Sequence, residues 1–243
     1  MKVLIVLAHP ERKSFNGAML DTAVEYFQKA GHEVQISDLY RLNFNPVSDR
    51  HNFQTVKDPD YFKQQQEEMY AAELNSFSAD LESEFAKLQW CDLLILQFPL
   101  WWFSVPAILK GWFDRVLAMG RAYGGGRWFE QGVFAGKRAF LSLTTGGVAS
   151  SYEADGLHGD INQILYPLNH GVLRFIGFDV LPPFLVWSPV RLDEEARRHE
   201  LLRYSDYLAE IENGLEPIKY PLLSDYDEQF RLKNPVKQAT RPS

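Results

Sequence analysis

The sequence predicts an α/β fold with a doubly wound parallel sheet, and two observations indicate it. Short apolar runs recur along the chain without polar alternation, as is typical of parallel strands whose two faces are both covered by helices. Segments with helical periodicity separate these runs, and parallel neighbours need such crossover helices. We therefore expect five strands that alternate with five helices on both faces of one sheet.

The first strand is expected over residues 2–8, a continuous apolar run. A helix should follow, with Asn16 as its N-cap and Gly31 as the residue that ends it. Residues 34–39 are predicted as the second strand. The alternation then continues, with elements expected at helix 79–89, strand 93–98, helix 105–119, strand 138–144, helix 161–176, strand 180–186 and helix 193–212.

Two segments fall outside this alternation. Residues 40–78 form a long insert rich in Asn, Asp, Gln and Glu, and loops of this length usually carry function or lie against a partner. After residue 214 the apolar positions are scattered and show no periodicity. We expect one domain over residues 1–213 and an extension over residues 214–243 that packs on this domain or on a partner subunit.

Charge and composition exclude several classes of protein. The 243 residues carry a formal net charge of −7, without the basic excess that binding to phosphate backbones needs, so no nucleic-acid partner is expected. The single cysteine, Cys91, excludes an intrachain disulfide and favours a cytoplasmic location. The N-terminal apolar run is too short for a signal peptide, and the longest uncharged run, 93–109, contains two prolines, so no transmembrane segment is expected. The histidines lack ligand spacing, and no metal site is predicted.

Three loops at the carboxyl ends of the predicted strands should hold a ligand, because open α/β sheets bind ligands there. Residues 9–16 open a helix whose N-terminal N–H groups suit a phosphate, although both glycine-rich nucleotide motifs are absent. Residues 144–160 contain adjacent glycines at 146 and 147, which either expose backbone donors to a flat ligand or make a turn. Residues 99–103 place aromatic rings on a loop, where they would stack on a planar group or form a subunit interface. A flavin nucleotide is planar and has a phosphate tail, so it fits these loops best.

Four blocks of sequence occur in an order that resembles one known family, and they are LAHPERKSFN at 7–16, QFPLWWFSVPAILKGWFDRV at 97–116, LTTGG at 143–147 and GLHGDIN at 156–162. The chain resembles the NAD(P)H:quinone oxidoreductases of the DT-diaphorase type, which are flavoproteins of flavodoxin-like fold. The resemblance implies the strand order 2-1-3-4-5 and a flavin cofactor, for which chain length favours FAD and FMN stays the alternative. It also implies a ping-pong, two-electron hydride transfer from NADH or NADPH through the flavin to a quinone or a similar small aromatic acceptor.

The resemblance also implies roles for particular residues. Tyr152 and His158 match a catalytic pair that handles charge and protons during the reaction. The residues that would bind the cofactor are His9, Ser14, Phe15, Asn16, Pro99, Leu100, Trp101, Trp102, Phe103, Thr144, Thr145, Gly146, Gly147, Tyr152 and Arg197. The residues that would line the nicotinamide and quinone site are Trp102, Phe103, Tyr123, His158 and Phe175. The active site of this family is completed by a second subunit, so the resemblance implies a homodimer.

The chain departs from the family pattern at three places. Trp101 stands where the family usually has glutamine, Lys13 replaces a small hydroxyl residue, and the three glycines at 124–126 replace a segment with a second tyrosine. Substrate preference therefore does not transfer. A flavin-dependent azo or nitro reductase is one alternative, and a flavodoxin-fold regulatory subunit of a potassium-efflux transporter is another. An electron-carrier flavodoxin is disfavoured because its Ser/Thr-rich phosphate loop is absent.

Overall fold

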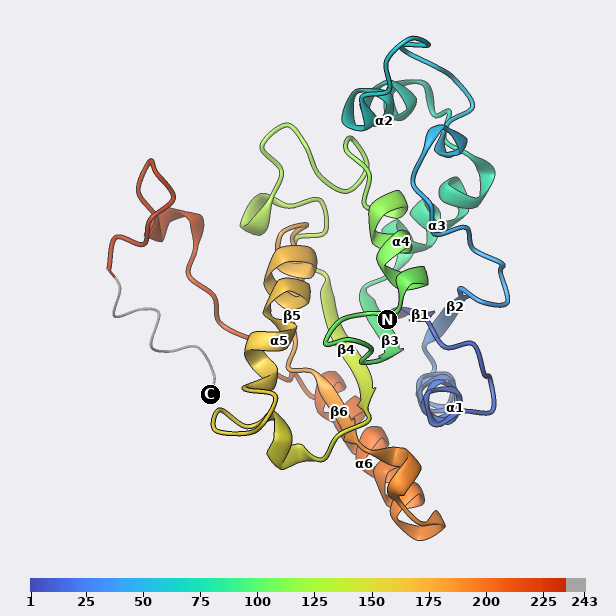
Figure 1. Ribbon diagram of the computed structural model, residues 1–243, viewed down its shortest axis with the longest axis vertical. Helices are drawn as coiled ribbons and strands as arrows, with labels where there is room; N and C mark the ends of the chain where they lie inside the picture. The colour runs from blue at the N-terminus through green and yellow to red at the C-terminus, as the bar shows by residue number, and fades with distance from the viewer. Residues whose placement is uncertain (235–243) are drawn as a thin grey trace.

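The sheet of the protein is parallel and confirms the predicted fold class and strand order. The computed structural model describes residues 1–234, and its strands are β1 (Lys2–Leu7), β2 (Glu33–Asp38), β3 (Leu93–Pro99), β4 (Arg138–Thr145), β5 (Asp179–Val180) and β6 (Phe184–Trp187) (Figure 1). They lie in the order β2-β1-β3-β4-β5, and β6 also pairs with β4. Leu7 lies beside Gln97, and Pro99 lies beside Thr144, so β1, β3 and β4 end along one edge of the sheet.

Two hydrophobic cores bury the two faces of this sheet. The helices are α1 (Phe15–Lys29), α2 (Gln64–Leu74), α3 (Ala79–Trp90), α4 (Ala107–Val116), α5 (Ile161–Leu168) and α6 (Glu194–Glu212). Val3 and Ile5 of β1 pack with α1 and α6, whereas Leu4 and Val6 pack with α3, α4 and α5. Burial on both faces explains the unbroken apolar runs of the sequence. Within residues 1–234, every helix is too short or too polar to cross a bilayer.

The insert and the helix after it differ from their predictions. The insert holds an unpredicted helix, α2, whose buried positions include Glu67 and Glu68, so its sequence lacks an apolar stripe. α4 ends at Val116, before the predicted residue 119, because the Met119 amide donates at 2.7 Å to the Glu68 carboxylate. Burial raises the pKa of Glu68. Both differences from the prediction, the presence of α2 and the earlier end of α4, therefore involve polar groups that periodicity does not report.

Prolines divide two other predicted elements. The strand expected at 180–186 is split into β5 and β6, and the connecting segment contains Pro182 and Pro183, which have no N–H to donate to β4. The helix expected at 161–176 ends as an α-helix at Leu168 and continues as a π-helix over Asn169–Arg174. Pro167 lies at this change and cannot donate the usual helix hydrogen bond.

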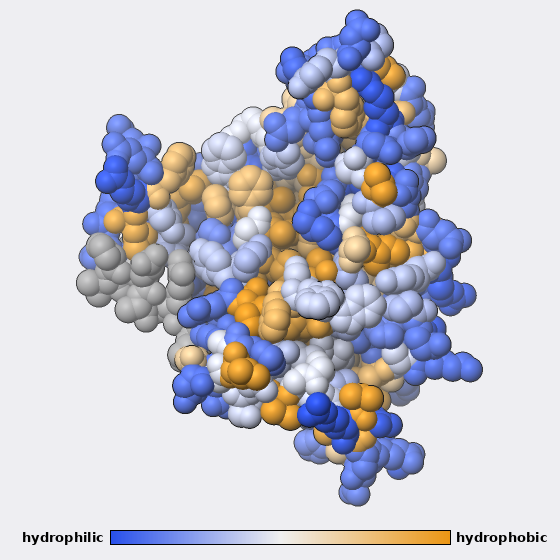
Figure 2. All heavy atoms as spheres, viewed as in Figure 1, coloured by the Kyte–Doolittle hydropathy of each residue, from blue (hydrophilic) through white to orange (hydrophobic). Residues whose placement is uncertain are grey.

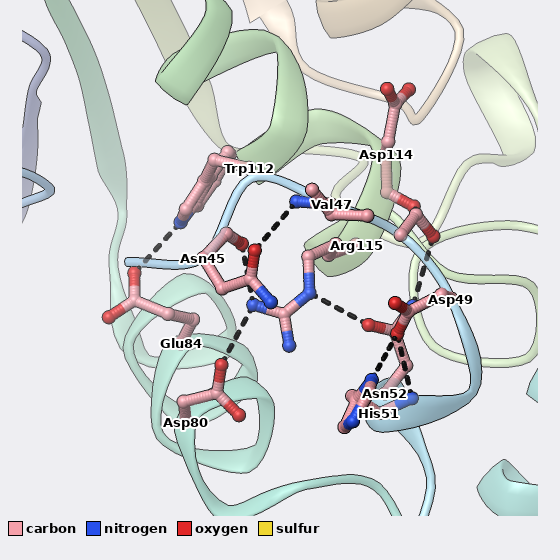
Figure 3. Close-up of polar contacts among 11 residues, drawn as sticks. Asn45, Val47, Asp49, His51, Asn52, Asp80, Glu84, Trp112, Asp114 and Arg115 are labelled. Carbon is pink, nitrogen blue, oxygen red and sulfur yellow. Dashed lines mark hydrogen bonds and ion pairs between the residues drawn. The ribbon is translucent and has the colours of Figure 1, made fainter. Parts of the chain in front are cut away.

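A buried guanidinium holds the insert against the rest of the domain. Arg115 of α4 is 2% exposed, and it donates to Asn52 Oδ1 at 2.7 Å and to Asn45 O at 2.8 Å, both in the insert (Figure 3). It also donates to Asp80 Oδ2 of α3 at 2.8 Å. A buried charge without partners is costly, so these three contacts fix the insert against α3 and α4.

The described part of the C-terminal extension packs on the same domain. Ile218 N donates to Val180 O at 2.8 Å, and Leu223 N donates to Glu130 Oε2 at 3.4 Å. Ile218 and Tyr220 also pack against the core that contains α5. In Figure 1 the extension, drawn in red, lies on the side of the domain away from α1. Residues 235–243, which the sequence assigns to this extension, lie outside the described residues.

Candidate functional site

A cavity of about 680 Å³ opens at the edge of the sheet where β1 and β4 end. Its walls come from the loop after β1, the start of α1, the end of β4 and the first turns of α6. The predicted cofactor residues that line it are His9, Ser14, Phe15, Asn16, Thr144 and Arg197, and Lys13 lines it as well. We call it the α1–α6 cavity. It brings together residues that are distant in sequence and that were expected to share one cofactor.

The N-terminus of α1 forms part of this cavity. The prediction that Asn16 caps the helix is wrong: Ser14 is the N-cap, and its Oγ accepts a hydrogen bond from Gly17 N at 3.2 Å. Gly17 has no room for a side chain, because a Cβ would lie 1.9 Å from Arg12 O. Arg12 itself is held by Gly17 O and by Asp21. The backbone amides and the positive dipole end of a 15-residue helix therefore suit an anion at this end of the cavity.

A chain of buried hydrogen bonds joins β3, α1 and β4 at the same place. Gln97 Nε2 donates to Asn16 Oδ1 at 2.9 Å, and Asn16 Nδ2 donates to Thr144 Oγ1 at 2.9 Å. Gln97 is fully buried, and Asn16 and Thr144 are 2% and 6% exposed. The sequence interpretation missed Gln97 as a site residue. Its signal was present, because it is the only polar side chain in the apolar strand β3.

Three basic side chains line the cavity, Lys13 before α1 and Arg197 and Arg198 on α6. Lys13 precedes α1, and within residues 1–234 it takes part in none of the salt bridges. Arg197, on α6, donates from Nε to Pro189 O at 3.0 Å, which leaves the ends of its guanidinium for a ligand. Its neighbour Arg198 is paired with Glu194 at 2.5 Å. Lys13 and Arg197 therefore bring positive charge to the cavity and take part in no salt bridge of the described chain, and the Glu194 carboxylate also lines the cavity.

His9 supplies an imidazole to the cavity. Its Nδ1 lies 3.0 Å from both Glu11 N and Glu11 O, so it accepts from the amide in one tautomer and donates to the carbonyl in the other. Burial lowers the pKa of His9 below its usual value of 6.5, and this effect is larger than the opposing effect of Glu11. Near neutral pH the residue is therefore an uncharged imidazole, and in the tautomer with the proton on Nε2 it would donate to a phosphate oxygen.

The loop after β3 is a tight two-residue turn built from aromatic residues. Pro99 and Leu100 are buried, and Trp101 and Ser104 exchange two backbone hydrogen bonds of 3.0 and 2.9 Å. The two residues between them, Trp102 and Phe103, both have positive φ, 51° and 58°. Their exposed fractions are 96% and 48%. Bulky residues rarely adopt this conformation, so the fold holds two rings at the surface against local backbone preference.

Four rings form a cluster beside this turn. The His158 ring lies 5.2 Å from the Phe103 ring and 4.9 Å from the Tyr152 ring, and Tyr152 lies 5.3 Å from Trp187, all between centroids. Tyr152 is buried, and burial raises the pKa of its phenol, so the hydroxyl keeps its proton at neutral pH. We call these four residues the first ring cluster. It contains both residues of the predicted catalytic pair.

The glycines after β4 connect this cluster to the cavity. Thr145 Oγ1 donates to Gly147 O at 2.8 Å, and Ser188 Oγ donates to Gly146 O at 3.0 Å, which fixes the backbone of this loop. A Cβ on Gly147 would lie 3.0 Å from the Tyr152 ring, whereas one on Gly146 would meet open space. The open space beside Gly146 leaves room for a ligand next to this backbone, whereas Gly147 is required by the close approach of the Tyr152 ring.

The other predicted acceptor-site residues lie in a different group of rings. Phe175 lies 5.9 Å from Tyr123, 6.4 Å from Trp128 and 5.6 Å from Phe129 between ring centroids, and we call these four the second ring cluster. No ring contact within residues 1–234 joins the two clusters. The structure therefore does not bring Tyr123 and Phe175 to Tyr152 and His158 within one chain. Figure 2 shows apolar side chains gathered in the middle of the face that carries α4 and α5.

Within the part of the chain that the structure describes, no group of three or more His, Cys, Asp or Glu side chains could hold a metal ion.

Comparison with known proteins agrees with this geometry. The sequence matches the model of a family described as having a flavodoxin-like fold, over residues 1–208. It is 49% identical over 197 residues to NAD(P)H dehydrogenase (quinone) 1 of Rattus norvegicus, covering 81% of this chain and 72% of that protein. The chain belongs to the NAD(P)H:quinone oxidoreductase family.

Two further similar proteins show how far the likeness extends. Human ribosyldihydronicotinamide dehydrogenase (quinone) is 43% identical over 211 residues, which cover 86% of this chain and 91% of that protein. The crystal structure of a quinone reductase from Klebsiella pneumoniae, described as putative, superimposes with a TM-score of 0.92 at 38% identity, covering 96% of this chain and 94% of that one. The likeness therefore extends beyond the α/β domain into the extension.

Proposed function

We propose that the protein is an FAD-dependent NAD(P)H:quinone oxidoreductase that works by a ping-pong, two-electron mechanism. The observation that carries the proposal is the position of the α1–α6 cavity next to the first ring cluster. Thr144 lines the cavity, and Gly147, three residues further along, lies against the Tyr152 ring. A ligand that fills the cavity with its phosphate end would thus place a flat ring system near Tyr152 and His158.

The lining of the cavity supports FAD over FMN. The start of α1, His9 and Lys13 offer donors and positive charge to a phosphate group. The opposite wall, with Pro189, Val190 and Arg197, extends away from this phosphate end along α6. FMN ends at its phosphate and would leave this wall without a contact. The adenosine half of FAD would cover it.

The bound flavin would supply the redox chemistry by accepting a hydride from NAD(P)H and delivering it to the acceptor. The protein's own residues would orient the reactants and handle charge. The Tyr152 hydroxyl keeps its proton at neutral pH and can donate a hydrogen bond to negative charge. His158, in ring contact with Tyr152 and Phe103, is placed to accept or deliver a proton. The exposed rings of Trp102 and Phe103 would exclude water from the ring system.

A homodimer would complete this site. The two ring clusters are separate within one chain, yet both contain residues that the family places at the acceptor. A second copy would bring its Tyr123 and Phe175 to the exposed Trp102 and Phe103 of the first. The apolar face in Figure 2 offers area for such a contact. Cys91 is a buried free thiol, which supports the proposed cytoplasmic location.

The proposed activity is tested on the purified protein by an absorption spectrum and by NADH and NADPH oxidation with and without a benzoquinone. We expect a flavin spectrum, release of FAD on denaturation, and oxidation that depends on the quinone. A colourless protein that cannot be reconstituted with flavin would refute the proposal. Bound flavin without quinone-stimulated turnover would favour a regulatory subunit, and faster turnover with an azo dye or a nitroaromatic would favour the alternative reductase.

The dimer is tested by sedimentation of the FAD-loaded protein. We expect twice the mass of the 28.0 kDa chain. A Trp102→Asp variant, which places a charge on the most exposed ring, should sediment as a monomer and lose quinone reduction. A monomeric wild type with full activity would exclude a shared site.

A further inference from the structure

We propose that Gln97 is a positioning residue. It determines whether Asn16 and Thr144 donate or accept hydrogen bonds, and so whether the phosphate end of the site presents donors to the ligand. The inference rests on the proposed function, because the ligand concerned is the cofactor. Gln97 does not line the α1–α6 cavity. Its hydrogen-bond partner Asn16 does, and so does Thr144, to which Asn16 donates in turn. Any effect of Gln97 on the ligand therefore passes through these two side chains.

One end of the chain of hydrogen bonds is fixed by a sulfur atom. Gln97 Nε2 lies 3.6 Å from Met19 Sδ, and all of these side chains are buried. A thioether can accept a hydrogen bond and cannot donate one, so the amide nitrogen of Gln97 must face it. The opposite orientation would place Gln97 Oε1 against the lone pairs of sulfur. Met19 therefore selects which end of the Gln97 amide acts on Asn16.

This choice passes along the chain to the cavity. Because Gln97 donates to Asn16 Oδ1, Asn16 must turn Nδ2 toward Thr144. Thr144 Oγ1 accepts that hydrogen bond and keeps its own proton to donate elsewhere. Ser14 Oγ likewise accepts from Gly17 N, so its hydroxyl proton is also left to a ligand. The wall then presents hydroxyl donors, which suit the oxygen atoms of a phosphate group.

A side chain at position 97 that can only accept would reverse the donor and acceptor roles of Asn16 and Thr144. In a Gln97→Glu variant the carboxylate can only accept, so Asn16 would turn Nδ2 toward it and Oδ1 toward Thr144. The Thr144 hydroxyl would then donate to Asn16 and present lone pairs to the phosphate. Gln97→Met differs, because it removes the constraint without imposing the opposite direction.

Apoprotein variants are titrated with FAD, and the dissociation constants are compared with that of wild type. At pH 8 we expect Gln97→Met to weaken FAD binding about tenfold, because a hydrogen bond to the charged phosphate is lost. Gln97→Glu should weaken it about 100-fold, because the lost hydrogen bond is replaced by repulsion between lone pairs and the phosphate. Met19→Leu, which keeps the volume and removes the sulfur acceptor, should weaken binding about threefold, and Met119→Leu is its matched control. Thermal unfolding of each variant shows whether it is folded.

Two measurements distinguish a reversal of the hydrogen bonds from a loss of binding caused only by altered packing around residue 97. Burial should raise the pKa of the new carboxyl group, and once protonated it can donate to Asn16 as the amide does. Relative to wild type, Gln97→Glu should therefore regain at least tenfold in FAD affinity between pH 8 and pH 5, and Gln97→Met should regain none. In a Thr144→Val background, Gln97→Glu should cost less than threefold. Equal pH profiles for the two Gln97 variants, or fully additive losses with Thr144→Val, would overturn the inference. A wild type that binds no FAD would instead refute the proposed function.

Discussion

The α1–α6 cavity and the first ring cluster are adjacent, but they are built in different ways. In the cavity, polar groups are fixed by hydrogen bonds, as Ser14 is by Gly17 and Asn16 is by Gln97 and Thr144. In the first ring cluster, the rings of Tyr152 and His158 contact each other, and the His158 amide donates to Ser151 O at 2.8 Å. The cavity is complete within one chain, whereas the rings expected opposite the cluster lie elsewhere. We infer that the cavity determines binding and the ring cluster determines rate.

The largest effect is expected in the first ring cluster, as a loss of rate without a loss of binding. The double variant Tyr152→Phe with His158→Gln should slow reduction of the bound flavin by NAD(P)H about 100-fold, because it removes a donor and a proton carrier. FAD affinity should change less than threefold. Stopped-flow absorbance measures the rate, and the exposed residues Tyr61 and His199 provide matched controls as Tyr61→Phe and His199→Gln. If reduction is as fast as in wild type, the pair has no part in the chemistry.

The next effect is expected in the cavity, as a loss of binding. Arg197→Ala should weaken FAD binding about tenfold or more, because the guanidinium would make charge-assisted hydrogen bonds to the cofactor. FMN binding should hardly change, since FMN does not reach α6. Arg198→Ala is the comparison: Arg198 lines the same cavity but is already paired with Glu194, so its loss should weaken FAD binding less. Equilibrium titration measures both affinities. Equal losses of affinity for FAD and FMN would contradict the assignment of this wall to the adenosine half of FAD.

The turn at Trp102 and Phe103 should show a smaller effect, in which stability and rate change in opposite directions. Both residues have positive φ, a conformation that costs roughly 1–2 kcal/mol for a non-glycine residue. Asn-Gly suits such a turn, so the double variant Trp102→Asn with Phe103→Gly should raise the free energy of unfolding of the apoprotein by about 1 kcal/mol. Quinone reduction should fall at least tenfold.

Urea unfolding measures this change in stability. Trp128→Asn replaces an exposed ring at an ordinary φ of −145° and should not stabilise the protein. If the turn variant is less stable than wild type, the backbone of the turn is not strained, and the rings instead stabilise the fold.

The same contrast between regions explains what the sequence could predict. The strands and their burial on both faces followed from apolar periodicity, because such burial leaves unbroken runs such as β1, whereas the strand order came from the family resemblance. Periodicity does not report polar contacts between distant segments. It therefore missed α2, whose buried side chains include Glu67, and it placed the cap of α1 at Asn16 instead of Ser14. The residue types of the site were predicted from motifs. The division of the rings into two clusters was not, because it depends on distances in three dimensions.

The smallest effect concerns pH and the cavity. The pKa of His9 in the folded apoprotein is below 6.5, so the folded state binds fewer protons than the unfolded state just below pH 6.5, and His9 lowers stability there as the pH falls. A phosphate beside the imidazole favours its charged form and should raise this pKa. FAD binding should then take up a fraction of a proton, and FAD affinity should rise a few-fold from pH 7.5 to pH 5.5.

Titrations of wild type and His9→Gln at several pH values test this linkage. FAD is the suitable probe because a phosphate monoester such as that of FMN titrates itself near pH 6. The slope of log affinity against pH should be negative for wild type and flat for His9→Gln. Glu11 also faces His9, so Glu11→Gln should leave a slope of the same sign. A flat wild-type profile would place the diphosphate away from His9 and would leave Lys13, Arg197 and the start of α1 as the groups that hold it.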